Sequence, residues 1–310
     1  MERTAFVSTT STAPQRGRKA QPARRIRPLQ VAIPALLIGF LVLFFASQNR
    51  GGGGGGAVAR LDTEDVHALL FSPLDPQQIF FGHHGGIKVS GDQGSSWQDG
   101  SLAGADAMSL AASPQNPQRI YAAGHEVFFR SDDGGQSWAP VEGALQGADI
   151  HGFAVSPDDA NLVYAYVANA GLQMSRDGGT TWQPLGPVGQ LTALAAGAGD
   201  QLFAGTATEG VLESTDGGLS WQRGGLSSFG TQISALAIDP RSGELYAGAM
   251  MGTMPMLHRR LESGAWETVS FSGTNPILAI ALSPHEDGLL VLVDQAGRVY
   301  RSRDGGQSWG

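Results

Sequence analysis

The 310-residue sequence contains no cysteine. This absence excludes disulfides, thiolate metal ligands, a cysteine nucleophile and a cysteine-linked lipid anchor, whatever the compartment. Basic residues are also scarce after residue 50, where 12 Lys and Arg stand against 27 Asp and Glu, a net charge of −15. Because such a field repels nucleic acid and anionic lipid headgroups, we expect no nucleic-acid partner.

Two further features are missing. There is no P-loop, no HExxH and no GxSxG followed by a plausible triad. After residue 56, no stretch has the length or the 3.6-residue period of a soluble helix. Short apolar runs are instead bounded by Gly, Pro, Asp and Ser, which is typical of strands and predicts an all-β domain.

One motif, Ser-x-Asp-x-Gly-x-Ser/Thr-Trp, occurs five times along the chain. Its aspartates and tryptophans are Asp92 and Trp97, Asp133 and Trp138, Asp177 and Trp182, Asp216 and Trp221, and Asp304 and Trp309. A sixth, eroded version ends at Trp266 and has lost both the Ser and the Asp. Consecutive tryptophans are 39 to 45 residues apart. A period near 40 with strand-like patterning indicates propeller blades, each a four-stranded sheet.

The motif has the composition of a hairpin turn. Gly135 and its equivalents can adopt positive φ without steric cost, and Asp133 can accept hydrogen bonds from backbone N–H groups across the bend. Trp138 supplies a large apolar plate, which we expect to lock each blade to its own sheet.

These repeats resemble the Asp-box, or bacterial neuraminidase repeat, of sialidases, sortilin-type receptors and photosystem II assembly-factor propellers. The resemblance covers residues 57–310 and implies a six-bladed β-propeller in which the motif is structural and lies away from the ligand face. It also implies two kinds of function, a binding or assembly module and a glycosyl hydrolase. The Arg-Ile-Pro motif of sialidases is not matched, because Arg-Ile occurs only as Arg25-Ile26 and Arg119-Ile120. Their arginine triad is not expected either, because the propeller has only 12 basic residues and several of them adjoin the motif.

The repeat arithmetic predicts how the ring closes. The expected innermost strands are residues 66–71, 108–112, 150–155, 191–195, 233–238 and 277–282. The sixth repeat ends one residue past Trp309 and lacks an outermost strand. We expect residues 57–61 to supply it and so remove an open edge; the alternative is a truncated chain.

The N-terminal segments predict a membrane anchor. Residues 1–28 form a basic tail that we expect to be disordered and cytoplasmic. Residues 29–47 carry no charge and are close to the roughly 20 residues needed to cross a bilayer. The basic flank before them keeps the N-terminus inside and the propeller outside, and residues 48–56 form a Gly-rich linker. A cleaved signal peptide is the competing interpretation, although Phe44-Phe45-Ala46 lacks the small residue expected at the first position of an A-x-A site.

Candidate ligand-binding residues gather on the face opposite the motif turns, which we call the top face. Asp65-x-His67, Asp106-x-Met108 and Asp149-x-His151 occupy equivalent positions at the starts of blades one to three, with further histidines in the neighbouring loops. Because loops on a rigid scaffold carry function, we expect a protein or carbohydrate ligand to contact Asp65, His67, His83, His84, His125, Asp149 and His151.

Two alternatives concern the same face. Glycoside hydrolysis needs two carboxylates about 5 to 9.5 Å apart, for which the candidates are Asp65, Asp106, Glu126 and Asp149. No cofactor is required by the sequence, but a metal is possible, and its candidate ligands are His67, His83, His84, His125, His151, Met254, Met256 and His258. Thioethers with imidazole suit Cu(I), although a Met cluster is also an adaptable apolar surface. A metal held by imidazoles should bind more weakly as the pH falls through about 6.5.

The predicted topology can be tested on intact cells. Protease added from outside should digest the propeller, because the basic flank leaves it on the extracytoplasmic side. Immunoblotting against the propeller before and after cell lysis, with a cytoplasmic protein as control, measures this. Full protection of the propeller in intact cells contradicts the predicted orientation.

Overall fold

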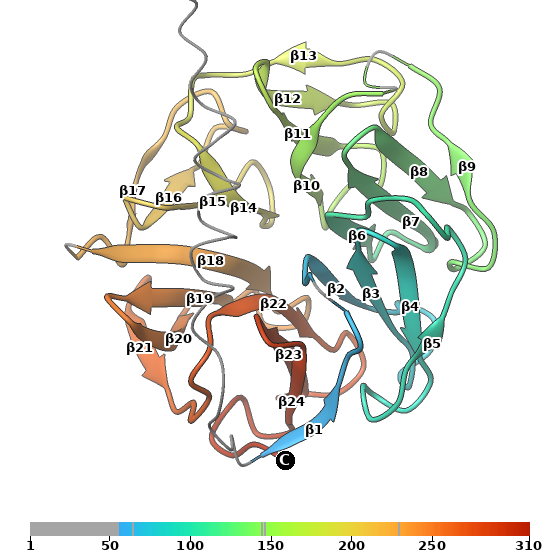
Figure 1. Cartoon of the computed structure of the whole chain (residues 1–310). Helices are drawn as coiled ribbons and strands as arrows, with labels where there is room; N and C mark the ends of the chain where they lie inside the picture. Colours follow the sequence, from blue (N-terminus) through green and yellow to red (C-terminus); the bar gives the residue numbers. More distant parts are fainter. Residues whose placement is uncertain (1–55, 64, 144, 146, 229) are drawn as a thin grey trace, which may run out of the picture. The chain divides into compact units, whose positions relative to one another are not determined.

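The computed structural model describes residues 56–63, 65–143, 145, 147–228 and 230–310. Twenty-four strands form six four-stranded antiparallel sheets arranged around a central axis (Figure 1). The described part is therefore an all-β, six-bladed propeller, as expected. The described residues from 56 onward belong to one compact unit, which contains these sheets and the core between them.

The blades follow one another along the chain. Blade one contains β2 (Ala68–Phe71), β3 (Ile79–His83), β4 (Gly86–Ser90) and β5 (Gln98–Asp99). Blade two contains β6 (Ser109–Ser113), β7 (Asn116–Gly124), β8 (Val127–Ser131) and β9 (Ala139–Pro140). Blade three contains β10 (Ile150–Val155), β11 (Val163–Val167), β12 (Gly171–Ser175) and β13 (Gln183–Pro184).

The second half of the ring repeats this pattern. Blade four contains β14 (Leu191–Ala196), β15 (Leu202–Thr206), β16 (Val211–Ser214) and β17 (Gln222–Gly225). Blade five contains β18 (Thr231–Ile238), β19 (Leu245–Met251), β20 (Met254–Arg260) and β21 (Trp266–Val269). Blade six contains β22 (Ile277–Leu282), β23 (Leu290–Asp294) and β24 (Arg298–Ser302). The innermost strands agree with the expected runs to within two residues at each end.

Burial along the strands explains their sequences. In β23, Leu290–Asp294, every residue is buried, as is every residue of β15. Neighbouring blades cover both faces of these second strands, so their sequences are continuous apolar runs rather than alternating ones. The core therefore lies between blades, as where Tyr121 and Phe128 of blade two pack with Phe153 of blade three.

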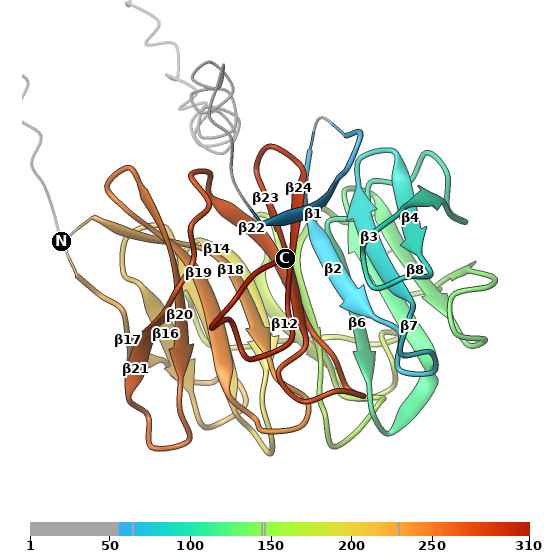
Figure 2. The ribbon, with the colours of Figure 1, turned by 90° about the horizontal axis from the view of Figure 1, so that it is seen from below.

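The ring is closed by β1 (Ala57–Arg60), which pairs antiparallel with β24 as the outermost strand of blade six (Figures 1 and 2). Ala57 pairs with Tyr300, Ala59 with Val299 and Arg60 with Arg298, and the Leu61 N–H donates to the Gly297 carbonyl at 2.7 Å. The predicted closing strand is confirmed. It covers β24, which would otherwise be an open edge.

The motif turns share one hydrogen-bond pattern. In blade three, Asp177 Oδ1 accepts from the Thr180 and Thr181 N–H groups at 3.0 and 2.9 Å, and Oδ2 accepts from Thr181 Oγ1 at 2.6 Å. The Gly179 N–H donates to the buried Ser175 Oγ at 2.9 Å, and that hydroxyl donates to Asp177 Oδ1 at 2.7 Å. The motif is thus a closed polar turn whose carboxylate binds its own backbone.

The expectation that each Trp locks a blade to its own sheet holds for Trp97, whose ring lies 6.0 Å from Phe81 of the same blade, but it does not hold for every Trp. The Trp182 ring lies 6.0 Å from Phe128 of the preceding blade, and Trp138 Nε1 donates to Ser101 Oγ, which precedes blade two. Gly179 has a φ of +97°, and a Cβ there would lie 2.6 Å from the Phe128 ring. The turn of blade three therefore packs onto the preceding blade.

The segments predicted for the N-terminus lie outside the described residues. These are the tail at residues 1–28, the membrane span at residues 29–47 and all but the last residue of the linker at residues 48–56. Within the described part, no helix is long and apolar enough to span a membrane.

Acid should destabilise the propeller through its motif turns. Hydrogen bonds, first from the hydroxyl and then from the N–H of the residue four positions later, lower the pKa of Asp133, Asp177, Asp216 and Asp304 to about 2. Because the folded-state pKa is depressed, this stabilisation is present above the unfolded pKa of about 4 and is lost as the pH falls from about 4 to about 2.

The Asp177→Asn variant measures this contribution by thermal unfolding between pH 7 and pH 2. Near neutral pH, its melting temperature should lie a few degrees below that of the wild type. This difference between the two melting temperatures should disappear as the pH falls to about 2. Asp62→Asn is the control, because Asp62 is exposed and its side chain makes no hydrogen bond with the described residues. Parallel curves for wild type and Asp177→Asn would contradict the assignment.

Candidate functional site

Three carboxylates lie at equivalent positions on the top face of blades one to three. Asp65, Asp106 and Asp149 each stand two residues before the residue whose side chain lines the top of the central cavity, namely His67, Met108 or His151. Blades four to six have Gln190, Gln232 and Pro276 at the corresponding places. The carboxylates are thus confined to one half of the ring.

Two loop histidines fill the spaces between these carboxylates. His84 lies in the β3–β4 hairpin and His125 in the β7–β8 hairpin. Each hairpin is bonded to the start of the next blade, since the Ala107 N–H donates to the His83 carbonyl at 3.3 Å and the Glu126 N–H to the Ala148 carbonyl at 3.1 Å. The approach is close at Gly124, where a Cβ would lie 1.8 Å from the Asp106 carbonyl oxygen.

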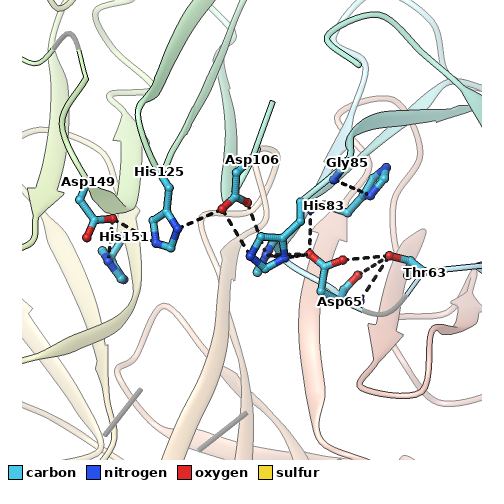
Figure 3. A network of polar contacts seen from close by, with 10 residues as sticks. Thr63, Asp65, His83, Gly85, Asp106, His125, Asp149 and His151 are labelled. Carbon is cyan, nitrogen blue, oxygen red and sulfur yellow. Dashed lines mark hydrogen bonds and ion pairs between the residues drawn. The ribbon is translucent and has the colours of Figure 1, made fainter. Parts of the chain in front are cut away.

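The result is a continuous line of alternating carboxylates and imidazoles across three blades (Figure 3). We call it the Asp/His row, and its members are Asp65, His67, His84, Asp106, His125, Asp149 and His151. Four of the chain's seven histidines belong to it. These seven side chains come from five separate segments, so only the folded ring brings them together.

The first end of the row surrounds Asp65. Its Oδ2 lies 2.9 Å from His67 Nε2, contacts His84 Nδ1 and accepts the His84 backbone N–H at 2.7 Å. The two imidazoles approach each other, with 3.2 Å between His67 Nε2 and His84 Nδ1. Thr63 Oγ1 donates to the other carboxylate oxygen at 3.1 Å and so holds its orientation.

The middle and far end follow the same alternation. Asp106 Oδ2 lies 3.4 Å from His84 Nε2 and 3.1 Å from His125 Nδ1. Asp149 Oδ1 lies 3.1 Å from His125 Nε2 and 2.9 Å from His151 Nε2. Each loop histidine therefore faces one carboxylate with each of its ring nitrogens.

Two carboxylate oxygens in the row lack hydrogen bonds. Asp106 Oδ1 and Asp149 Oδ1 are buried, and no donor among the described residues makes a hydrogen bond to either. Two imidazole nitrogens, from His125 and His151, lie within 3.1 Å of Asp149 Oδ1. Neither makes a hydrogen bond to it, because neither ring presents an N–H that points toward the oxygen. Buried polar atoms in native proteins usually have partners, so these two indicate a ligand position.

The row also perturbs Asp65. Burial alone would raise the pKa of Asp65, but the contact with the His67 ring and the hydrogen bond from the His84 N–H outweigh it and hold the pKa well below its usual range. Asp65 is therefore a carboxylate near neutral pH.

Several residues predicted for the site lie apart from the row. His83 turns away, stacks on Phe81 with 5.8 Å between ring centroids and accepts the Gly85 N–H, and burial lowers its pKa. Glu126 is exposed beside His125, and among the described residues its carboxylate forms no ion pair with a member of the row. Met254, Met256 and His258 lie on β20 of blade five, across the axis from blade two (Figure 1). His258 is buried, which lowers its pKa.

Asp106 was expected only as a catalytic candidate, yet it lies at the centre of the row. The signal that could have placed it among the ligand-binding residues is its spacing, since it occupies the same position as Asp65 and Asp149 in the repeat. Thr63 was not foreseen, because nothing in the sequence pairs it with Asp65.

Two cavities lie along the axis. The top one, of ≈ 120 Å³, is lined by three residues from each blade and has His67 and His151 at its rim. The lower one, of ≈ 440 Å³, is lined mainly by apolar side chains and prolines and contains none of the predicted site residues. The row therefore borders the smaller cavity.

Comparison with known proteins identifies the fold. No protein-family model matches the sequence, and no curated protein matches it. Among solved structures, the chain is similar to a GH74 enzyme from Niastella koreensis, with a TM-score of 0.61 and 16% identity over 83% of this chain and 46% of that one. It is also similar to YCF48 from Cyanidioschyzon merolae, with a TM-score of 0.50 and 19% identity over 82% of this chain and 86% of that one.

A third similar structure is a chain of a nidogen/laminin complex, with a TM-score of 0.59 and 13% identity over 75% of this chain and 91% of that one. The chain spans less than half the length of the GH74 enzymes it resembles. At these identities, the similarities show a shared β-propeller fold.

Proposed function

We propose that this chain is a non-catalytic binding module, anchored in the membrane by residues 29–47, with a propeller that binds a protein ligand on its extracytoplasmic top face. The observation that carries the proposal is the Asp/His row, in which seven side chains from three blades converge beside the axis. Among the residues that the structure describes, every group of three or more His, Asp or Glu side chains close enough to hold a metal ion belongs to this row.

A binding role fits the row better than hydrolysis. A glycosidase needs one carboxylic acid with a raised pKa to protonate the leaving group. The pKa of Asp65 is shifted in the opposite direction, and the other two carboxylates of the row are both in contact with imidazoles. These contacts suit recognition of a cationic or metal-bearing ligand.

A protein ligand is favoured by two considerations. The similar structure from a nidogen/laminin complex contains a propeller in complex with another protein. The acidic propeller, with its net charge of −15 after residue 50, also favours partners that present cationic groups. GH74 enzymes supply the contrasting activity on the same fold, so fold alone does not decide between the two.

Site-specific photo-crosslinking in intact cells tests this proposal on the full chain. A photoreactive amino acid replaces Glu126, exposed on the top face beside the row, or Leu219, which is 64% exposed in a motif turn on the opposite face. We expect a protein adduct from position 126 and none from position 219. The adduct should fall at least about tenfold when Asp106→Ala is added, because Asp106 lies at the centre of the row, where the residues whose truncation costs about 2 kcal/mol or more cluster in interfaces.

His83→Ala is the matched control, since His83 lies on the same face but outside the row. It should leave the adduct unchanged, and circular dichroism melting establishes that each variant folds. An adduct formed only from position 219, or one from position 126 that survives Asp106→Ala, contradicts the proposed binding face.

A further inference from the structure

The Asp/His row divides into two sets of three ligand atoms, which we call triad one and triad two. Triad one consists of Asp65 Oδ2, His67 Nε2 and His84 Nδ1, and triad two of His125 Nε2, Asp149 Oδ1 and His151 Nε2. In each set, all three atoms lie within 4.8 Å of one another. Each triad thus offers two imidazoles and one carboxylate.

Two spacings in each triad match a metal coordination sphere, whereas the Asp65 Oδ2–His84 Nδ1 contact in triad one is shorter than such a sphere allows. Two ligand atoms that each lie about 2.0 to 2.2 Å from one ion are separated by about 3.0 to 3.5 Å in octahedral or tetrahedral geometry. In triad one, His67 Nε2 is 2.9 Å from Asp65 Oδ2 and 3.2 Å from His84 Nδ1. In triad two, Asp149 Oδ1 is 3.1 and 2.9 Å from the two imidazole nitrogens.

Hydrogen bonding does not account for triad two. Asp149 Oδ1 is buried and accepts no hydrogen bond from the described residues, although His125 Nε2 and His151 Nε2 both lie against it. Nitrogen lone pairs that converge near an oxygen without donating to it can all face a common cation. A bound cation would also satisfy the oxygen that is otherwise orphaned.

Asp106 joins the two triads. His84 presents Nδ1 to triad one and Nε2 to Asp106 Oδ2, while His125 presents Nε2 to triad two and Nδ1 to the same oxygen. Metal-bound histidines usually direct their second ring nitrogen to a carboxylate, which fixes the tautomer and the ring orientation. Asp106 is placed to do this for both loop histidines at once.

The donor set selects the class of ion. Imidazole with carboxylate suits Zn²⁺ and the neighbouring divalent transition metals, whereas Ca²⁺ and Mg²⁺ prefer oxygen ligands alone. Thioether donors, which would favour Cu(I), lie on blade five in Met254 and Met256 and belong to neither triad. Three protein ligands also leave coordination positions open, as in metal sites that bind a further ligand.

We infer that the Asp/His row binds two divalent transition-metal ions, one in each triad, with Asp106 as the shared positioning residue. The inference rests on the proposed function in one respect, because the open coordination positions are where the protein ligand would supply a donor such as an imidazole. Metal binding itself does not require that ligand.

Calorimetric titration of residues 52–310, free of any histidine tag, with Zn²⁺ tests the inference. We expect about two equivalents for the wild type and about one for His67→Ala, His84→Ala or His151→Ala, since each removes one ligand of a single triad. Asp106→Asn should retain two equivalents and weaken both by about 10- to 100-fold, as outer-shell substitutions do. Titration with Co²⁺, followed by its visible absorption, reports the coordination geometry of each site independently.

His83→Ala is the matched control for His84→Ala, because the two histidines are adjacent in one hairpin and only His84 belongs to a triad. It should bind two equivalents. The inference is overturned if Zn²⁺ does not bind at micromolar concentration or if His83→Ala behaves like His84→Ala. The inference is also overturned if the wild type binds a single equivalent of Zn²⁺, and if His84→Ala and His125→Ala lose it while His67→Ala and His151→Ala keep it. That pattern would place one ion at the middle set of His84, Asp106 and His125.

The two proposals can fail separately. If Zn²⁺ does not bind while Asp106→Ala still abolishes the crosslink from position 126, the metal inference fails and the binding face stands. If two equivalents bind but the crosslink is unaffected by Asp106→Ala, the metal sites stand and the proposed binding face fails.

Discussion

The pairing of β1 with β24 is the constraint on which the site depends. Residues 61–67 run directly from the closing strand to the innermost strand of blade one, and they carry Thr63, Asp65 and His67. The Leu61 N–H is bonded to the Gly297 carbonyl of blade six, so this segment is fixed at both ends only when the ring is closed. Asp65 can then contact His84, whose hairpin is hydrogen-bonded to the start of blade two. Closure thus converts six similar sheets into a scaffold rigid enough to hold side chains from three blades in line.

The repeat is symmetric, but the chemistry is not. Blades one to three place ionisable groups at the top of the axis, whereas blades four and five place hydroxyls there. Thr192 Oγ1 donates to the Ile233 carbonyl at 2.7 Å and Ser234 Oγ to the Ile277 carbonyl at 2.6 Å, so these hydroxyls tie each blade to the next. The hydroxyl groups in that half of the ring thus make hydrogen bonds that stabilise the fold. In the Asp/His row, Asp106 Oδ1 and Asp149 Oδ1 accept no hydrogen bond from the described residues, which is why we assign the row to ligand binding.

The fold was largely predictable because the determining signals are local and repeated. The spacing of the motif gave the blade count, and the innermost strands β10 and β22 begin and end where their apolar runs predict. The position of each Trp was harder to predict, because a motif seen once per blade cannot show which neighbouring sheet its ring contacts. Trp182 packs against Phe128 only because adjacent blades are wedged together.

The candidate site was predictable in part for the same reason. Equivalent spacing identified Asp65, Asp149, His67 and His151, since repeat position fixes where these side chains lie on the ring. It could not decide between His83 and His84, because two residues next to a tight hairpin turn point in different directions. Met254 and His258 were candidates by chemistry alone, and the ring geometry separates them from the row by placing blade five across the axis from blade two.

A crystal structure of residues 52–310 grown with Zn²⁺, with anomalous diffraction recorded at the zinc edge, tests the central claim most directly. The account predicts two anomalous peaks, one within about 2.0 to 2.2 Å of the ligand atoms of each triad, with Asp106 between them contacting His84 and His125. Peaks found only elsewhere, such as beside Met254 or His258, or a row of histidines and aspartates with no peak at either triad, would contradict it.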